Sequence, residues 1–324
     1  MKLYEQDPPF AVQVELTEGC NFRCTFCGIQ GIREKPGGYK FMTMKTAAVL
    51  ANEIARLEWN ARIEFAMHGE PSINPDKVNI IQVFRQALPR NQLMMTSNGS
   101  GFVKNTEQQM LDIFGAGLNI LALDDYDNAN MVPRIRTALK NDGGIYKPPE
   151  QYDYPKDGLD YSPHRRWPRN TSVVLYIADI SKTKEGSHDS LNNHCGAAAP
   201  PNDRGQGKRC AKPFRELSVR WDGGVAICCN DWRGEFGIGN VNRMPLDQIW
   251  HHKLFTAARR KLYRGERDFG PCKGCDALSY RVGLLPDHRG HATLAKPTAE
   301  DLDLIRKAGN RQTLTQIVLR PWEA

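Results

Sequence analysis

Three closely spaced cysteines constrain this chain more than any other feature of its sequence. In the segment Glu18-Gly-Cys-Asn-Phe-Arg-Cys-Thr-Phe-Cys27 they stand in C-x3-C-x2-C spacing as Cys20, Cys24 and Cys27. A tight loop with this spacing can grip three corners of one cubane iron–sulfur cluster and leave the fourth iron open. An open iron suits reductive chemistry on a bound co-substrate, because the protein holds the metal without occupying the reaction position. Zinc binding and chance clustering are the alternatives, but zinc normally needs a fourth Cys or His in paired spacing, and none lies nearby.

The cysteine loop resembles that of the radical S-adenosylmethionine (SAM) enzymes, and the resemblance includes an aromatic residue, Phe26, just before the third cysteine. It implies that SAM binds the open iron of a [4Fe-4S] cluster through its amino and carboxylate groups. It also implies an electron donor such as flavodoxin or ferredoxin. The reaction it implies is cleavage of SAM to methionine and a 5′-deoxyadenosyl radical, which abstracts a hydrogen atom from the substrate.

Short apolar runs along the first two thirds of the chain predict buried strands. They cover residues 10–16, 62–66, 92–96, 118–123 and 171–177. A helix is expected from an N-cap at Thr43 to about Trp59. The family resemblance implies an α/β fold, a partial (β/α) TIM-like barrel of five or six parallel strands. The cluster loop would follow the first strand, at the end of the barrel where active sites are assembled.

The second expected strand ends in Met67-His-Gly-Glu-Pro71, where the family carries a Gly-Gly-Glu-Pro-like segment that holds the SAM ammonium group. Gly69, Glu70 and Pro71 match that segment and are the implied cofactor-binding residues. His68 replaces the first glycine and places a titratable side chain beside the cofactor. His68 is therefore a catalytic candidate, although most buried histidines are only hydrogen-bonded.

Polar residues also follow the third and fourth expected strands. Ser97 and Asn98 stand where the family contacts the ribose and carboxylate of SAM, but Asn98-Gly99 is equally a turn signal. Asp124 is expected above the barrel mouth as a contact to substrate or SAM, or else as an ordinary helix cap. Tyr126, two residues further on, is a second catalytic candidate at this place.

Two irregular segments interrupt the pattern. Residues 141–170 have no periodicity and end in His164-Arg-Arg-Trp-Pro-Arg169, which predicts either a lid over the barrel or a nucleic-acid contact through Arg165 and Arg166. Residues 181–207 are polar and rich in Gly and Pro, and they contain Cys195. This cysteine is either a spare thiol or a catalytic hydrogen-atom donor.

A second cysteine set combines C-x17-C with a distant C-x2-C: Cys210, Cys228, Cys272 and Cys275. Residues 217–221 and 225–229 predict a hairpin around Asp222-Gly223-Gly224. Four thiolates there can saturate one iron–sulfur cluster or hold zinc. The surrounding sequence resembles the SPASM/twitch domains that follow radical SAM barrels, which implies one auxiliary [4Fe-4S] cluster. Cys229 is an alternative ligand to Cys228.

We therefore expect three parts: a radical SAM partial barrel in residues 1–205, a twitch domain of hairpin and helix in residues 206–285, and a C-terminal extension in residues 286–324. The second part should contain one helix from Pro245 to about Tyr263, and the third a helix at residues 299–308. The chain lacks an apolar run of membrane-spanning length and an N-terminal apolar signal region, which predicts a cytoplasmic protein without a membrane partner.

Composition bears on the substrate. The formal net charge of +7 and the Tyr/Arg/Trp segment favour a nucleotide or a modified DNA base, rearranged by an isomerase or oxidised by an oxidoreductase. The cysteine pattern fits a dehydrogenase of a small sugar or cyclitol. A peptide maturase is less favoured, because no leader-binding domain precedes the first expected strand. A metal-stabilised binding protein without activity is the least favoured, since binding alone does not need the three-cysteine loop.

Overall fold

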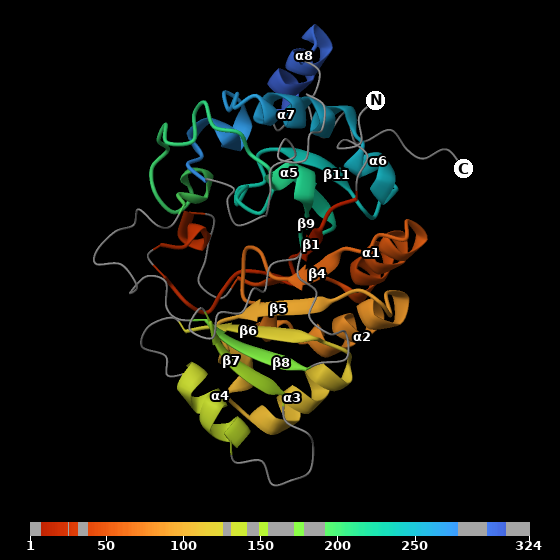
Figure 1. The fold of residues 1–324 in the computed structure, drawn as a ribbon, viewed down its shortest axis with the longest axis vertical. Coiled ribbons are helices and arrows are strands. Elements are labelled where there is room, and N and C mark those ends of the chain that lie inside the picture. Colours follow the sequence, from red (N-terminus) through yellow and green to blue (C-terminus); the bar gives the residue numbers. More distant parts are fainter. Residues whose placement is uncertain are drawn as a thin grey trace.

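The computed structural model describes residues 8–24, 26–31, 38–125, 131–140, 149–154, 172–177, 192–277 and 297–308. Its centre is a nine-stranded sheet with the order β11-β10-β9-β1-β4-β5-β6-β8-β7 (Figure 1). From β9 to β7 all neighbouring strands are parallel, while β10 is antiparallel to both β9 and β11. A separate pair, β2 (Thr17–Glu18) and β3 (Lys40–Phe41), flanks the cysteine loop.

The barrel strands lie where the apolar runs predict them. They are β1 (Ala11–Val14), β4 (Arg62–Phe65), β5 (Leu93–Ser97), β6 (Ile120–Asp124) and β8 (Val173–Ile177). The helices between them are α1 (Met44–Arg56), α2 (Lys77–Ala87), α3 (Thr106–Gly115) and α4 (Met131–Lys140). The N-cap of α1 is Thr43, as predicted, and its hydroxyl accepts a hydrogen bond from the Thr46 amide. This is a partial TIM-like barrel.

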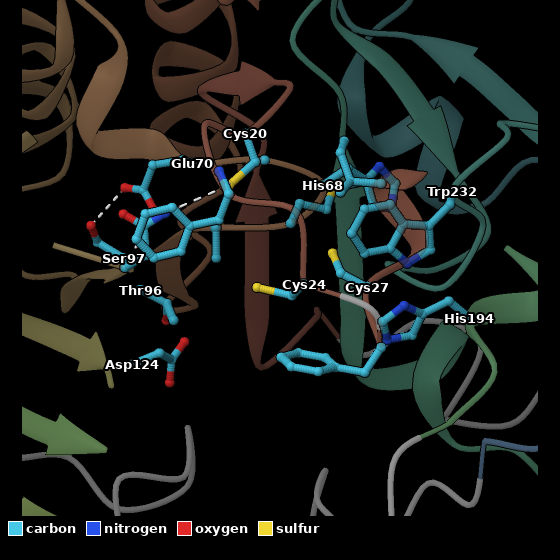
Figure 2. A pocket seen from close by; sticks show the side chains of 17 residues that line it. Cys20, Cys24, Cys27, His68, Glu70, Thr96, Ser97, Asp124, His194 and Trp232 are labelled. Atoms are coloured by element: carbon cyan, nitrogen blue, oxygen red, sulfur yellow. Dashed lines mark hydrogen bonds between the residues drawn. The ribbon is translucent and has the colours of Figure 1, made fainter. Parts of the chain in front are cut away.

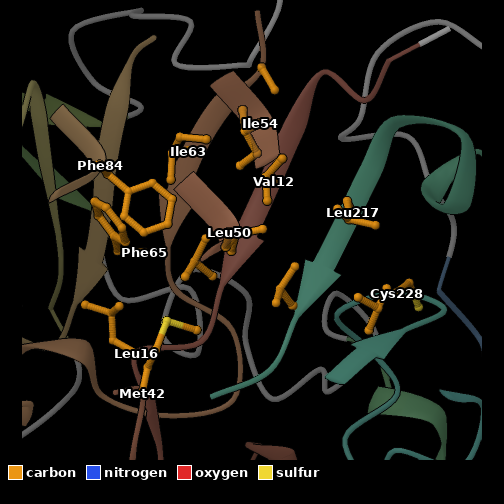
Figure 3. Packing of buried hydrophobic residues seen from close by; sticks show 14 of the residues in the cluster. Val12, Leu16, Met42, Leu50, Ile54, Ile63, Phe65, Phe84, Leu217 and Cys228 are labelled. Carbon is orange, nitrogen blue, oxygen red and sulfur yellow. The ribbon is translucent and has the colours of Figure 1, made fainter. Parts of the chain in front are cut away.

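The two faces of the sheet differ because successive side chains of a strand point to opposite sides. Val12, Ile63 and Phe65 pack outward with α1 and α2 in the main core, shown in Figure 3. The inner face is polar around β1, where Gln13 donates to Glu64 on β4 and lies 3.5 Å from Glu216 on β9. Across the barrel the inner face is apolar. It carries Met94, Ile120, Ala122, Val173, Leu175 and Ile177.

The C-terminal module extends the same sheet. It contains α5 (Lys212–Arg215), β9 (Glu216–Val219), β10 (Gly224–Ala226), β11 (Gly237–Asn240), the 3₁₀ turn η7 (Gly270–Gly274) and α8 (Ala299–Ala308). The predicted hairpin is β9–β10, and the predicted C-terminal helix is α8. β9 pairs with β1 in parallel register, Leu217 opposite Val12. Leu217 and Cys228 belong to the same apolar cluster as Val12 (Figure 3).

Two expectations need correction. The segment predicted to be irregular, residues 141–170, contains the edge strand β7 (Glu150–Tyr154), which pairs with β8 along its whole length. The predicted helix 245–263 is two helices, α6 (Leu246–Trp250) and α7 (Lys253–Tyr263). It breaks because His252 is extended and its side chain caps the Leu254 amide, starting a new helix. None of the described helices combines the length and apolar character needed to cross a bilayer.

Candidate active site

A cavity of about 260 Å³ opens at the carboxyl ends of β4, β5 and β6, beside the cysteine loop (Figure 2). Its described lining is Cys20, Phe22, Cys24, Phe26, Cys27, Ile29, Ala66, Met67, His68, Gly69, Glu70, Thr96, Ser97, Asn98, Asp124, His194 and Trp232. This set includes the three loop cysteines and nearly all the predicted SAM contacts. Pro71 lies directly behind the lining as the first residue of a 3₁₀ turn, and Tyr126, Arg165 and Arg166 fall outside the described residues.

The three loop cysteines line the same cavity, as binding of three corners of one cubane cluster would require. Cys20, Cys24 and Cys27 are all partly exposed toward the cavity. Burial, Glu70 and the neighbouring thiols together raise the pKa of Cys20 to about 12, so a positively charged group would be favourable beside this thiolate. Among the described residues, no three His, Cys, Asp or Glu side chains are placed to hold a single metal ion. A cluster has wider spacing, because each thiolate binds a different iron.

Gly69 is required by close packing against the cysteine loop. A Cβ at this position would lie 2.1 Å from the Thr17 carbonyl oxygen and 2.5 Å from that of Gly19. The Glu70 amide donates to the Gly19 carbonyl over 3.0 Å. The Gly-Glu-Pro segment is therefore attached directly to the residue that precedes Cys20.

Glu70 organises the ends of two strands. Its buried carboxylate accepts hydrogen bonds from the Ser72 amide (2.8 Å), the Ser97 hydroxyl (2.6 Å) and the Asn98 amide (2.7 Å). Burial raises its pKa, and these hydrogen bonds oppose the shift. Glu70 thus fixes Ser97 and Asn98 at the cavity. The Asn98 side chain in turn lies 3.6 Å from Cys20 Sγ and donates to Asn21.

His68 is fully buried and joins the barrel to the C-terminal module. Its Nε2 lies 2.7 Å from the carbonyl oxygen of Cys229, and its Nδ1 lies 2.9 Å from Glu15 Oε1, in poor alignment for a hydrogen bond. The preceding residue, Met67, has a φ of 117°, a strained conformation for a side chain of this kind. His68 replaces a glycine of the family segment, and here it forms a structural link across the module boundary.

Two aromatic residues complete the cavity from the C-terminal part of the chain. The Trp232 ring lies 4.6 Å from that of His68 and is stacked on His194, with centroids 5.0 Å apart and planes at 17°. His194 Nδ1 accepts a hydrogen bond from the Gly28 amide over 3.0 Å. Sequence reasoning missed both residues as functional candidates, because no local pattern marks a contact between residues so far apart in the chain.

The second cysteine set also converges. Cys210, Cys228, Cys272 and Cys275 are all buried. Burial raises the pKa of Cys228 and Cys272, and Cys210 raises both further. The Cys229 thiol instead lies 3.4 Å from Lys212 Nζ. This arrangement favours Cys228 as the ligand.

Cys195 lies with this second set. A hydrogen bond between its thiol and that of Cys275 raises the pKa of Cys195 and lowers that of Cys275 to about 7. Cys195 is absent from the described cavity lining, whereas the adjacent His194 is part of it. The thiol of Cys195 contacts Cys275, and its role as a hydrogen-atom donor stays a prediction.

Family profiles match both parts of the chain. The profile described as the radical SAM superfamily matches residues 14–124. The SPASM profile, an iron-sulfur cluster-binding domain, matches residues 210–276. The chain therefore belongs to the radical SAM superfamily and carries a SPASM domain, as the two cysteine patterns predict. It is an enzyme that uses SAM and a [4Fe-4S] cluster, with an auxiliary iron–sulfur cluster in the SPASM domain.

The chain is also similar to individual proteins of this superfamily. The chain is 22% identical over 274 residues to the S-adenosyl-L-methionine-dependent 2-deoxy-scyllo-inosamine dehydrogenase of Niallia circulans, covering 84% of this chain and 94% of that protein. It is 30% identical over 122 residues to GTP 3′,8-cyclase of Mycolicibacterium smegmatis, covering 37% and 32%. The solved structure of BtrN in complex with AdoMet and 2-DOIA matches with a TM-score of 0.65 at 19% identity, covering 86% of this chain and 98% of that chain. This likeness confirms the partial barrel with its antiparallel C-terminal region.

Proposed function

We propose that the protein is a radical SAM dehydrogenase that oxidises a hydroxyl group of a small polyol of the aminocyclitol type. The cavity carries this proposal. Its described lining contains the carboxylate of Asp124, in addition to the Glu70 that fixes Ser97 and Asn98, and no Lys or Arg. A polyol or an amine suits such a lining, because carboxylates accept hydrogen bonds from hydroxyl and ammonium groups.

The hypothesis that the substrate is a nucleotide or a DNA base is not supported, and neither is an isomerase reaction on a DNA base. Phosphate recognition normally relies on Arg or Lys, which the described cavity lining lacks. The dehydrogenase named for 2-deoxy-scyllo-inosamine is matched over 94% of its length, whereas a GTP 3′,8-cyclase of Cronobacter sakazakii is matched over 71% of its length, both at 22% identity. The small-cyclitol alternative is therefore favoured over the nucleotide reading.

We assign cluster binding to Cys20, Cys24 and Cys27. Bound there, the cluster supplies the electron that cleaves SAM to a 5′-deoxyadenosyl radical. Gly69, Glu70, Ser97 and Asn98 would hold SAM over the loop, with Phe26 beside it, all of them at the cavity. Holding the substrate C–H bond close to the radical and excluding water are the tasks left to the protein.

Oxidation of a secondary alcohol removes a hydrogen atom, a proton and an electron. SAM bound at the cavity would supply the acceptor of the hydrogen atom, which would leave as part of 5′-deoxyadenosine. We assign the proton to Asp124, a carboxylate that lies at the end of β6 and lines the cavity. The second cysteine set, Cys210, Cys228, Cys272 and Cys275, would hold an auxiliary [4Fe-4S] cluster, and this cluster would supply an acceptor for the electron. The products are a ketone, methionine and 5′-deoxyadenosine.

A substrate panel tests this function. Anaerobically reconstituted protein is incubated with SAM, a reductant and one of three probes: 2-deoxy-scyllo-inosamine, GTP or a single-stranded oligonucleotide. We expect only the cyclitol to yield a product lighter by two hydrogen atoms in mass spectrometry. A changed nucleotide with an unchanged cyclitol, or a cyclitol product of unaltered mass, would contradict the proposal.

A further inference from the structure

His194 is held in an unusual backbone conformation at the edge of the cavity. It opens the 3₁₀ turn η6 (His194–Gly196), and both His194 (φ 47°) and Cys195 (φ 53°) lie in the left-handed region. Two consecutive residues with side chains rarely adopt this conformation, and such strain persists only where surrounding contacts enforce it. Asn193 provides these contacts: its amide donates to Asp276 Oδ1 and its side chain donates to the Gly274 carbonyl, both over 2.7 Å.

The hydrogen bond to Gly28 defines which nitrogen of His194 carries hydrogen. Because Nδ1 accepts from the Gly28 amide, its lone pair is in use and a neutral ring carries its hydrogen on Nε2. Burial and the nearby His68 together lower the pKa of His194 to about 4, which keeps the ring neutral. Within the described part of the chain, Nε2 has no hydrogen-bond partner, and stacking on Trp232 fixes the ring plane.

We propose that His194 is a substrate-binding residue that donates its Nε2–H to an oxygen of the bound polyol. This inference rests on the proposed function and adds a specificity determinant to it. His194 is a donor and not a general base, because the only nitrogen able to take a proton is already bonded to Gly28. It therefore orients the substrate and leaves the proton to another group.

His194 and Asp124 together define what the cavity recognises. Figure 2 shows them on opposite sides of Cys24, with Asp124 at the end of β6 and His194 beside Trp232. One side offers a hydrogen-bond donor and the other an acceptor. A ring bearing several hydroxyl groups can satisfy both at once. Since Gly28 directly follows Cys27, the donor is also fixed relative to the cluster loop.

Two substitutions separate the two nitrogens of His194. In His194→Asn the side-chain oxygen can replace Nδ1 and keep the Gly28 bond, while the donor into the cavity is lost. In His194→Gln the amide nitrogen can reach the place of Nε2 and keep that donor. With SAM-loaded, cluster-containing enzyme and 2-deoxy-scyllo-inosamine as the probe, we expect His194→Asn to weaken binding about tenfold, the effect of about one hydrogen bond. His194→Gln should stay within about threefold of the wild type.

Three measurements distinguish a failure of the proposed function from a failure of the role proposed for His194. Calorimetry gives the dissociation constant, iron analysis tests the clusters, and 5′-deoxyadenosine formed without substrate tests SAM cleavage. Wild-type enzyme that does not bind the cyclitol contradicts the proposed function itself. If the wild type binds it and His194→Asn binds equally well, His194 is not a substrate donor. A loss of iron in both variants, or a lower kcat at an unchanged dissociation constant, would likewise overturn the inference by making His194 structural or a proton carrier.

Discussion

Neighbouring cysteines at the end of β10 face different surroundings. Cys228 is buried with Cys210 and Cys272, whereas the Cys229 thiol lies beside Lys212 and Glu216. We expect Cys228→Ser to reduce the iron content from about eight atoms per chain, the total for two cubane clusters, to about four. Cys229→Ser is the matched control and should keep about eight. Iron analysis after anaerobic reconstitution measures this, and the reverse pattern would make Cys229 the ligand.

His194 should make the fold sensitive to acid. Its pKa in the folded protein is about 4, below the usual value of 6.5, so protons bind the unfolded chain more readily. Its contribution to the free energy of unfolding is complete above about pH 6.5 and is lost as the pH falls toward 4. Between pH 7.5 and 5.5 we expect a loss of about 1 kcal/mol.

Anaerobic urea unfolding at several pH values measures this loss. His194→Asn is the control and should remove this part of the pH dependence. A wild-type profile identical to that of the variant would show that His194 does not carry it.

Asp124, the proposed proton acceptor, can be tested against its neighbour in the chain. Asp124 lines the cavity, while its neighbour Asp125 does not. We expect Asp124→Asn to lower ketone formation about a hundredfold, the usual contribution of a positioned base, while 5′-deoxyadenosine still forms. Asp125→Asn should behave like the wild type. Equal rates for the two variants, measured by mass spectrometry of both products, would remove Asp124 from the mechanism.

The sequence predicts single residues well where spacing or capping is local. The C-x3-C-x2-C loop lies at the cavity, and Thr43 caps α1, because each signal spans only a few residues. Trp232 and His194 could not be found in this way. Their importance comes from contacts with His68 and Gly28, which only the folded chain brings together.

Among the elements, the loop that carries Cys272 and Cys275 depends on one buried arginine. Arg267 is 1% exposed and donates to the carbonyl oxygens of Lys208 (2.9 Å), Arg209 (3.2 Å), Cys275 (3.3 Å) and Ala277 (3.0 Å). It therefore joins the segment before Cys210 to the segment around Cys275.

Removing this arginine should loosen the second cysteine set. We expect Arg267→Gln to lower the free energy of unfolding by roughly 3 kcal/mol, because several buried carbonyls lose their donor, and to reduce auxiliary iron. Arg264→Gln is the control, since the Arg264 side chain pairs with Glu266 at the surface of the described structure. Denaturant unfolding and iron analysis check both variants, and unchanged values for Arg267→Gln would refute its clamping role.

The prediction of strands and helices succeeded for long apolar runs. It failed where tertiary contacts determine whether a strand forms or where a helix ends. The five predicted barrel strands are present, but β7 was missed because its alternating Glu-Gln-Tyr-Asp-Tyr sequence has few apolar residues and depends on pairing with β8. The break between α6 and α7 depends on the His252 cap. It also depends on the buried Arg259, which donates to the Trp250 carbonyl over 2.7 Å.

For the whole molecule, the expected boundary near residue 205 crosses a continuous sheet. β9 pairs with β1, and Arg220 beyond β9 pairs with Glu18 beyond β1. The division into barrel and twitch domains near residue 205 stays a prediction from two independent cysteine patterns. The pairing of β9 with β1 could not be predicted, because pairing between distant strands leaves no local signal.

Because the sheet is continuous, we expect β1 and β9 to unfold together in one local opening event. Backbone amides of Ala11–Val14 and Glu216–Val219 should exchange hydrogen with the same free energy of opening, and a destabilising change in either strand should shift both. Hydrogen exchange followed by mass spectrometry measures this. Much faster exchange in β9 than in β1 would mean that the modules open independently.

Deuterium transfer from the substrate tests directly whether the protein is a radical SAM dehydrogenase of a small cyclitol. The anaerobic holoenzyme is incubated with SAM, a reductant and 2-deoxy-scyllo-inosamine carrying deuterium on its hydroxyl-bearing carbons. We expect one deuterium in 5′-deoxyadenosine for each ketone formed, because the 5′-deoxyadenosyl radical takes the hydrogen from the carbon that is oxidised. Unlabelled 5′-deoxyadenosine formed without ketone would contradict it.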